Sequence, residues 1–175
     1  MATTTVNFSP NTQYTNSVYI DSNLLVYSRN RISTKYREAV ALLGNLITQN
    51  VTLYISNLVI DEVWYALLMG WHRARTGQNL NFKRNPAIIQ IYKYLIERAT
   101  DKFLNLPNIQ IVSSPANKKQ FIQNVREYLF SENLAPRDGF HLALTIENNI
   151  SGFVTSDSDF DLLSLPNHNL TVYKY

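Results

Sequence analysis

The sequence predicts an α/β protein in which helices cover both faces of a central parallel sheet of about five strands. Short runs of β-forming residues alternate along the chain with longer segments whose apolar residues recur at helical spacing. Alternation of this kind favours a parallel, doubly wound sheet, and therefore a three-layer α/β/α architecture. With 175 residues, 45% of them hydrophobic, the chain is long enough to form one domain around a real core.

The strands are expected where β-branched and aromatic residues cluster. The first sixteen residues, MATTTVNFSPNTQYTN, contain no such cluster, and we expect them to form a flexible polar arm that precedes a single domain over residues 17–175. The five runs that predict strands are VYI (18–20, ended by Asp21), VTLYIS (51–56), NIQIVS (108–113), SGFVTS (151–156) and LTVYKY (170–175).

Helices are expected between these runs. Over residues 34–49 the apolar positions trace one helical face, and Ser56 or Asn57 can cap a helix that continues to Trp71. The polar, basic stretch 72–86 breaks that pattern, and Pro86 suits the first turn of the next helix. We therefore interpret residues 70–108 as an insertion of helix and loop. Two further helices are expected over residues 116–130 and 135–149.

Composition excludes several classes of protein. The chain has no cysteine, so disulfides and thiolate metal sites are absent, which fits a reducing cytoplasm. The apolar stretches are too short and too interrupted to cross a bilayer, and no secretion signal begins the chain. The net charge of +3 is compatible with a polyanionic partner.

Four carboxylates fall where a doubly wound sheet binds its ligands, beyond the carboxyl ends of the strands. Asp21 and Asp157 directly follow two strands, Glu62 lies in the helix after the second strand, and Asp138 lies in the first turns of a late helix. Such acids would repel one another unless a cation joined them. Oxygen ligands suit Mg²⁺ or Mn²⁺, so the sequence predicts a divalent-metal site.

The acidic run FVTSDSDFDLL (153–163) has a second metal interpretation, because its aspartates match the first, third and fifth positions of an EF-hand loop. The sixth and twelfth positions of that loop require glycine and glutamate. Here they are Leu162 and His168, which excludes an EF-hand calcium site. An alternative interpretation makes Asp157 and Asp159 caps of a short helix, and Asp138 a helix N-terminal charge.

Three segments of the chain resemble the PIN-domain family of metal-dependent ribonucleases, which includes the VapC-type toxins of bacterial toxin–antitoxin pairs. They are YIDSNLLVY (19–27), SNLVIDEVWYALL (56–68) and APRDGFHLALTIENNISGFVTSDSDF (135–160). The chain is longer than a typical toxin of this kind. Asp61 also precedes Glu62, which leaves the helix acid open by one position, and the spacing from Ser56 favours Glu62.

The resemblance implies a set of site residues. The catalytic acids would be Asp21, Glu62, Asp138 and Asp157, and the metal would be held by Asp21, Asp138 and Asp157, with Asp159 as an auxiliary ligand. Asn23 and Thr155 would support the site from behind these acids. His141 is expected to be a hydrogen-bonded, partly buried histidine and not a catalytic one.

The resemblance also implies an activity and partners. It predicts a cytoplasmic endoribonuclease that uses Mg²⁺ or Mn²⁺, leaves 5′-phosphate and 3′-hydroxyl ends, forms a homodimer and is silenced by an antitoxin protein. Two alternatives remain: a catalytically inactive PIN-like module that binds RNA or protein, and another metal-dependent phosphate enzyme such as a DNA nuclease. A phosphatase of the haloacid dehalogenase class would need D-x-D on the first strand, where this chain has Asp21-Ser22-Asn23.

Overall fold

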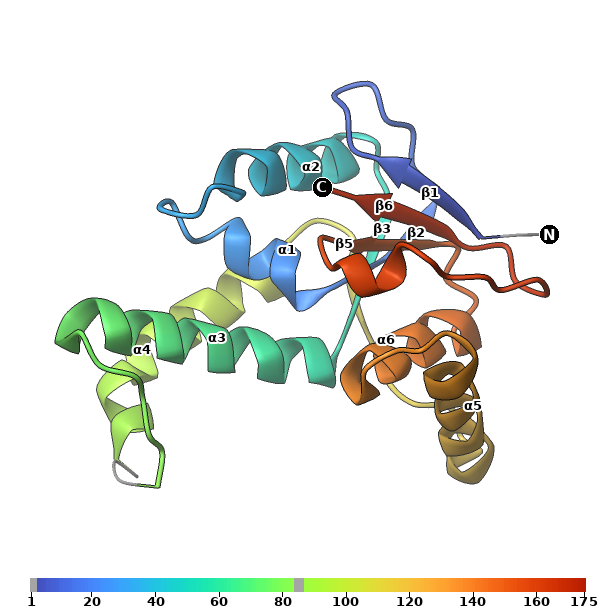
Figure 1. The fold of residues 1–175 in the computed structure, drawn as a ribbon. Coiled ribbons are helices and arrows are strands. Elements are labelled where there is room, and N and C mark those ends of the chain that lie inside the picture. Colours follow the sequence, from blue (N-terminus) through green and yellow to red (C-terminus); the bar gives the residue numbers. More distant parts are fainter. Residues whose placement is uncertain (1–2, 84–86) are drawn as a thin grey trace.

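The computed structural model describes residues 3–83 and 87–175 and contains a six-stranded parallel sheet (Figure 1). The strand order is β1-β6-β5-β2-β3-β4, and every neighbouring pair is parallel. The predicted α/β class is confirmed, with six strands in place of about five. The strands are β1 (Thr4–Asn7), β2 (Ser17–Ile20), β3 (Thr52–Ser56), β4 (Ile109–Val112), β5 (Gly152–Thr155) and β6 (Thr171–Lys174).

The additional strand, β1, lies inside the segment that we expected to be a flexible arm. It pairs in parallel with β6, from Thr4 opposite Thr171 to Asn7 opposite Lys174. The backbone N–H of Thr4 also donates to the carbonyl of Leu170, just before β6, at 3.0 Å, and that of Phe8 donates to the carbonyl of Lys174 at 2.7 Å. An edge strand needs only one partner and can remain polar and exposed, so its sequence carries no apolar run that would reveal it.

The helices form the outer layers. α2 covers one face of the sheet, and α6, with α5 packed beside it, covers the other (Figure 1). α1 follows β2 directly and packs against both α2 and α3. The helices are α1 (Ser22–Tyr27), α2 (Tyr36–Thr48), α3 (Asn57–Thr76), α4 (Ile88–Leu104), α5 (Lys118–Ser131) and α6 (Pro136–Glu147), with a short 3-10 turn, η1 (Ser158–Phe160).

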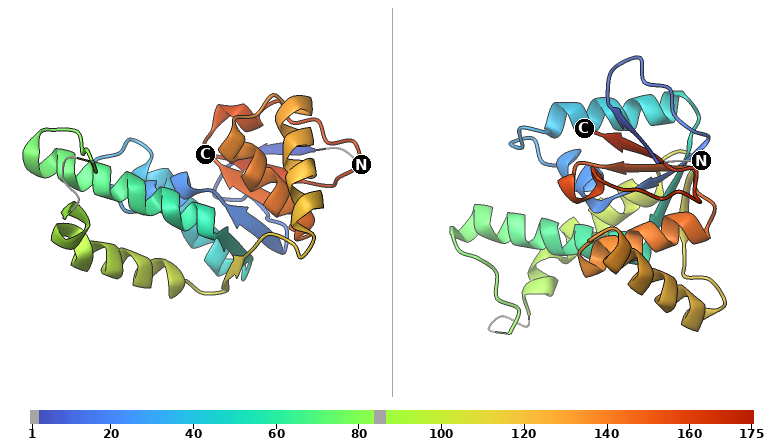
Figure 2. Two further views of the ribbon diagram at one scale, coloured as in Figure 1. Left: turned by 90° about the horizontal axis from the view of Figure 1, so that it is seen from below. Right: turned by 45° about the vertical axis from the view of Figure 1, so that its right-hand side comes forward.

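α3 continues past Trp71, where the sequence pattern ended it, to Thr76. It stops at Gly77, whose φ of 70° is left-handed and favours glycine. α3 and α4 then form a hairpin that extends away from the sheet (Figure 2) and holds a small core of its own, made by Leu68, Leu80, Ile88 and Tyr92. The expected insertion is thus a helical hairpin, and Pro86 lies outside the described residues.

The central strands β2 and β5 position the site. They are adjacent in the sheet with Ile20 opposite Val154, although more than a hundred residues separate them in the chain. Both side chains are fully buried, as are Tyr19 and Phe153, whose rings stack at a centroid distance of 5.6 Å. The residues that follow these strands, Asp21 and Ser156-Asp157, therefore emerge at one edge of a rigid core. No helix of the described residues is both long and apolar enough to cross a membrane.

Candidate active site

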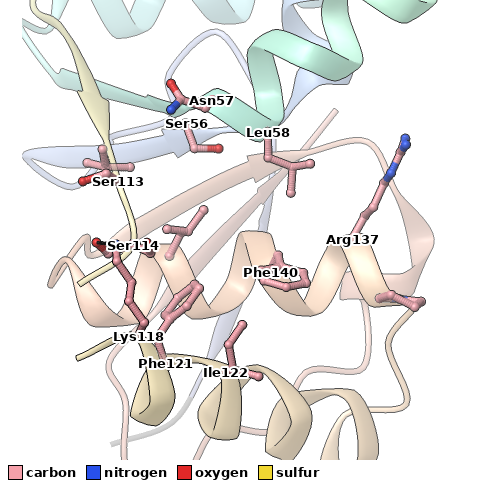
Figure 3. Close-up of a pocket in the computed structure, with 13 residues that line it drawn as sticks. Ser56, Asn57, Leu58, Ser113, Ser114, Lys118, Phe121, Ile122, Arg137 and Phe140 are labelled. Carbon is pink, nitrogen blue, oxygen red and sulfur yellow. Dashed lines mark hydrogen bonds between the residues drawn. The ribbon is translucent and has the colours of Figure 1, made fainter. Parts of the chain in front are cut away.

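Two cavities of similar size meet at the N-terminal end of α6, and Pro136 and Arg137 line both. The first, of about 640 Å³, is a mainly apolar groove between the start of α3, α5 and α6 (Figure 3). Its walls include Leu58, Phe121 and Phe140 but no carboxylate or histidine. We call it the α5–α6 groove; neither of the two groups of potential metal-binding side chains found among the described residues lies in it.

The second cavity, of about 620 Å³, gathers acids from four separate elements. Asp21 comes from the end of β2, Glu62 from α3, Asp138 from the first turn of α6, and Asp157 from the loop after β5. We call it the acid cavity. The structure thus brings together the four acids that the sequence singled out, and Asp159 lies beside them within reach of Asp138 and Asp157.

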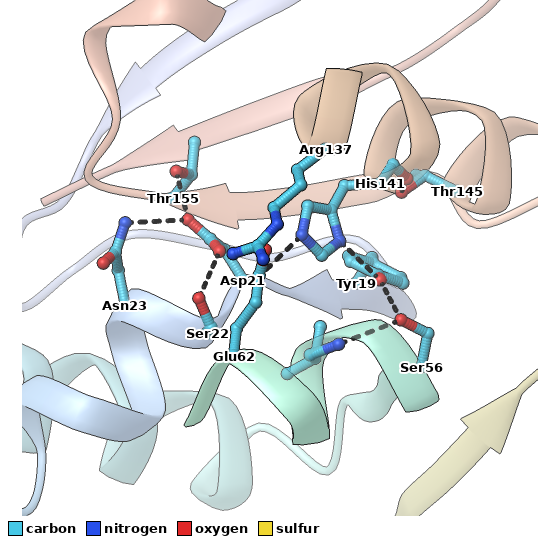
Figure 4. Close-up of polar contacts among 11 residues, drawn as sticks. Tyr19, Asp21, Ser22, Asn23, Ser56, Glu62, Arg137, His141, Thr145 and Thr155 are labelled. Carbon is cyan, nitrogen blue, oxygen red and sulfur yellow. Dashed lines mark hydrogen bonds and ion pairs between the residues drawn. The ribbon is translucent and has the colours of Figure 1, made fainter. Parts of the chain in front are cut away.

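Asp21 is held by the end of β5 and the start of α1. It is only 6% exposed, and its backbone N–H donates to the carbonyl of Val154 at 3.1 Å. Its Oδ2 accepts hydrogen bonds from Thr155 Oγ1 at 2.8 Å and Asn23 Nδ2 at 3.1 Å, and its Oδ1 accepts one from Ser22 Oγ at 3.2 Å (Figure 4). Asn23 and Thr155 therefore orient Asp21, in the positions that the resemblance implied.

Thr155 also connects the two acidic strand ends. Its side chain is fully buried, and while its hydroxyl donates to Asp21, it accepts a hydrogen bond from the backbone N–H of Asp157 at 2.9 Å. One hydroxyl therefore fixes the distance between two acids of the cavity. Asp157 Oδ1 in turn accepts from the N–H of Asp159 at 3.0 Å, so Asp157 does cap η1 in addition to lining the cavity.

Glu62, and not Asp61, faces the cavity. Adjacent helix positions point about 100° apart, and the structure leaves Asp61 exposed while the Glu62 side chain is 12% exposed. Glu62 contacts His141 Nε2 through Oε2 at 3.0 Å and Arg137 through Oε1 at 3.7 Å. Burial raises the pKa of Glu62, but the hydrogen bonds from His141 and Ser22 and the charge of Arg137 outweigh it, and the pKa is lowered.

Asp138, Asp157 and Asp159 form a group of three carboxylates, each offering one oxygen within 4.8 Å of the others. Among the residues that the structure describes, none of the three is in an ion pair with a lysine or arginine. Burial and the charge of Asp157 raise the pKa of Asp138 from 3.8 to about 6, with smaller contributions from Asp159 and Asp21. Repulsion of this kind is on the order of a few kcal/mol for each close pair of charges at a protein surface.

This crowding is the observation that tests whether the cavity suits a metal ion. Several carboxylate oxygens converge on one place, carry no neutralising side chain in the described part of the chain, and disturb the ionisation of Asp138. A hard divalent cation would remove that repulsion, and oxygen donors are the ligands that Mg²⁺ and Mn²⁺ prefer. The residues present therefore fit a divalent ion.

His141 is 2% exposed and hydrogen-bonded at both ring nitrogens, as expected for a buried structural histidine. Its Nδ1 lies 2.9 Å from the hydroxyl of Tyr19, which lies 2.6 Å from Ser56 Oγ (Figure 4). Ser56 caps α3 by accepting the backbone N–H of Val59 at 3.3 Å. The chain of contacts thus runs from a helix end through the core to Glu62.

Sequence reasoning missed three residues of the site. Ser22 donates to Asp21, Tyr19 contacts His141, and Tyr65 lines the acid cavity with about half of its surface exposed. Tyr65 follows Glu62 by three positions, so helical spacing placed both on the same face. Tyr19 carried no signal, because an aromatic residue inside a buried strand is normally core packing.

The chain belongs to the PIN-domain family, whose model matches residues 18–164. That match spans all four acids, and it confirms the resemblance that the three sequence segments indicated. A search among curated proteins found none that matches the sequence.

Solved structures share the fold at low sequence identity. A chain from the VapBC2 complex of Rickettsia felis, bound to a DNA fragment from its promoter, aligns with a TM-score of 0.53 and 20% identity over 89% of this chain and 96% of that one. VapC20 of Mycobacterium tuberculosis, a Sarcin-Ricin loop cleaving toxin, aligns with a TM-score of 0.50 and 15% sequence identity. The alignment covers 83% of this chain and 93% of VapC20. A chain of FitAcB from Neisseria gonorrhoeae aligns with a TM-score of 0.50 and 18% sequence identity, over 90% of this chain and 96% of that one.

Proposed function

We propose that the protein is a divalent-metal-dependent endoribonuclease and the toxin of a toxin–antitoxin pair. The observation that supports it most is the meeting of Asp21, Glu62, Asp138 and Asp157 in one cavity. Membership of the PIN-domain family and the fold shared with VapC20, a Sarcin-Ricin loop cleaving toxin, support it further.

The acids divide into two roles in this proposal. Asp21, Asp138 and Asp157, with Asp159 beside them, would hold Mg²⁺ or Mn²⁺. When bound, the ion would supply an activated water and neutralise charge on the phosphodiester. Glu62, ionised at neutral pH because its pKa is lowered, can accept a hydrogen bond from the attacking water and orient it.

Arg137 is a basic residue that lines the acid cavity. Its side chain is 63% exposed, contacts Glu62 Oε1 at 3.7 Å and lines both cavities. An exposed guanidinium at the mouth of an acidic cavity can bind the phosphates of the substrate and keep them in register. The exposed ring of Tyr65, which lines the same cavity, suits stacking of a base of single-stranded RNA.

The test is cleavage of RNA by Glu62→Gln and by its matched control Asp61→Asn, one residue away on the exposed side of α3. We expect Glu62→Gln to lower kcat by about 100-fold or more, and Asp61→Asn to leave it unchanged. Wild-type cleavage should require Mn²⁺ or Mg²⁺ and disappear in EDTA, and Asp138→Asn should match the EDTA result. Equal rates for Glu62→Gln and the wild type would contradict the site.

DNA of the same sequence separates the proposed activity from a DNA nuclease. We expect cleavage of RNA only, with 5′-phosphate and 3′-hydroxyl products that a ligase can rejoin. Binding of RNA without cleavage under any metal would instead favour the inactive PIN-like module.

The proposed partners are an antitoxin protein and a second copy of the chain. Structures that share the fold are described as VapBC2 and FitAB assemblies, which supports a protein partner. The α5–α6 groove is the apolar surface that we propose for self-association, because it is open, mainly apolar and bordered by Ile122, which is 52% exposed. A short reading frame beside the gene is the first candidate for the antitoxin, and its co-expression should relieve growth arrest.

A further inference from the structure

A buried row of hydrogen bonds leads from the start of α3 to Glu62, and its two ends have fixed polarity. At one end the backbone N–H of Val59 can only donate, and it does so to Ser56 Oγ at 3.3 Å. At the other end an ionised carboxylate can only accept, and Glu62 Oε2 does so from His141 Nε2 at 3.0 Å. Between these ends stand Tyr19 and Ser56, 0% and 2% exposed.

Fixed ends determine every proton between them. His141 must carry hydrogen on Nε2 to donate to Glu62. A neutral imidazole then has a bare Nδ1, which accepts from the Tyr19 hydroxyl at 2.9 Å. The Tyr19 oxygen accepts from the Ser56 hydroxyl at 2.6 Å, and Ser56 is left to accept from Val59. Each hydroxyl donates once and accepts once, each ring nitrogen makes one hydrogen bond, and all of these bonds run in one direction.

The opposite arrangement leaves a buried donor without an acceptor. If His141 donated from Nδ1, Tyr19 would have to donate to Ser56, whose oxygen already accepts from Val59. The Ser56 hydroxyl hydrogen would then lack a partner among the contacts of the described residues. An unsatisfied buried polar group of this kind typically costs about 1–3 kcal/mol. The directed arrangement is therefore favoured.

We propose that His141 is a positioning residue that holds Glu62 through Nε2–H, and that Tyr19 and Ser56 fix the direction of that hydrogen bond. The inference rests on the proposed function, because it assigns Glu62 its working orientation. One carboxylate oxygen, Oε2, is held from the core, while Oε1 faces Arg137 and the cavity. The carboxylate then cannot rotate freely when substrate enters.

The same proposal excludes His141 as a metal ligand, although its ring lies within 4.8 Å of oxygens of Asp21 and Glu62. A histidine binds a metal through a bare ring nitrogen. Here Nε2 carries the hydrogen and Nδ1 is occupied by Tyr19. The imidazole therefore serves the carboxylate and leaves the cation to the aspartates.

The first experiment reads the proton positions without using activity. Nitrogen-15 NMR of the histidine ring, at neutral pH and with and without Mg²⁺, distinguishes the two tautomers and the imidazolium. We expect His141 to be neutral, with hydrogen on Nε2, and unchanged by Mg²⁺. Hydrogen on Nδ1 alone, hydrogen on both nitrogens, or a change of His141 tautomer on adding Mg²⁺ would each overturn the proposal.

The second experiment compares variants that keep or remove the donor. His141→Gln retains an amide N–H near the place of Nε2, whereas His141→Leu does not. We expect His141→Leu to lower kcat by about 10- to 100-fold with KM unchanged, and His141→Gln to recover at least half of that loss on a logarithmic scale. Tyr19→Phe, which keeps the ring, should lower kcat by roughly three- to tenfold. Calorimetric Mn²⁺ affinity should be the same for all.

The chain provides a matched control in the hairpin. There His72 and Tyr92 form another buried histidine–tyrosine contact, Nδ1 to hydroxyl, at 3.5 Å, and neither residue lines the acid cavity. Tyr92→Phe should leave kcat unchanged. If Tyr19→Phe behaves like Tyr92→Phe, or if His141→Gln is as slow as His141→Leu, Glu62 is not positioned in this way. If Glu62→Gln itself is fully active, the proposed function is wrong. The NMR experiment still tests the position of the His141 hydrogen, because it does not depend on activity.

Discussion

Two carboxylates of one cavity are held in opposite electrostatic environments. Glu62 is surrounded by donors, from His141, Ser22 and Arg137, and its pKa is lowered despite burial. Asp138 is surrounded by other acids, and its pKa is raised to about 6. Environments that separate the ionisation of neighbouring acids are a common feature of sites that perform acid–base chemistry. Here the difference between the two pKa values also identifies Asp138 as the acid that lacks a neutralising partner within residues 3–83 and 87–175 and is available to a cation.

The raised pKa of Asp138 predicts a trade of stability against function. Below about pH 3.8 the carboxyl group is protonated in both the folded and the unfolded chain, and it does not change the free energy of unfolding. Above about pH 6 it is ionised in both, and its charge lowers the free energy of unfolding by the full amount. In EDTA at pH 7.5, Asp138→Asn should therefore raise the free energy of unfolding by about 1–2 kcal/mol, a figure reduced for partial exposure and a weaker helix N-terminal charge.

Urea denaturation at pH 7.5 and at pH 3.5 checks this. The gain should vanish at the lower pH if the protein remains folded there, and Asp61→Asn should give no comparable gain at either pH. An equal gain for Asp138→Asn at both values would assign the effect to helix propensity and not to charge. Because protonation of Asp138 would remove one of the proposed ligands, Mn²⁺ affinity should also weaken as the pH falls through about 6.

At the scale of elements, the site depends on how closely β2 and β5 approach their neighbours. Gly152 opens β5, and a Cβ there would lie 2.5 Å from Thr15 Oγ1, 2.9 Å from Val18 Cγ2 and 3.0 Å from Tyr173 Cε2. A side chain at this position would push apart the strands that carry Asp21 and Asp157. Gly44, in α2, meets nothing within 4 Å and is exposed.

These two glycines predict effects of opposite sign. Gly152→Ala should lower the free energy of unfolding by about 1–3 kcal/mol, because a packed core cannot absorb an added methyl group freely. Gly44→Ala should raise it by about 0.5–1 kcal/mol, because alanine is the better helix former. Chemical denaturation of both variants measures the pair. A neutral or stabilising Gly152→Ala would show that the strands can separate more easily than their contacts indicate.

The sequence identified elements well where burial leaves a periodic pattern, and poorly where it does not. The sequence predicted the buried strands at 18–20 and 151–156 from their β-forming residues, and it predicted α2 from its amphipathic pattern. β1 did not, because its residues, TTVN, are polar and mostly exposed. Extension of α3 through the basic residues up to Thr76 was also hidden, since that end of the helix projects beyond the sheet and needs no apolar stripe.

The residues of the candidate site were likewise predictable where a local sequence pattern marks them, and not where only the fold brings them together. Its acids could be found because spacing and strand ends placed them, and Ser56 distinguished Glu62 from Asp61. The supporting place of Thr155 was predicted only through the family resemblance, and its hydrogen bond to Asp21 was not predicted. Contacts made across the fold, such as those of Tyr19 with His141 and Ser56, depend on side-chain packing over a separation of 122 residues in one case, and no local pattern records them.

For the whole molecule, the open α5–α6 groove predicts self-association. Ile122 is on its rim and 52% exposed, so replacing it by glutamate would place a charge at the proposed contact between two copies. We expect Ile122→Glu to convert a dimer to a monomer in light scattering. Val40→Glu, on α2 and 42% exposed, is the matched control and should leave the mass unchanged. A wild-type monomer at all concentrations would contradict the proposal.

The parallel pairing of β1 with β6 has a practical consequence for anyone who handles this protein. This pairing covers a row of backbone amide and carbonyl groups along β6, which ends at Lys174. Trimming the first eight residues, or attaching a rigid fusion partner at that end, would uncover this row and offer it to strands from other molecules. Precipitation of such a shortened chain would then indicate that the edge of the sheet at β6 is unpaired, and not that the acid cavity is damaged.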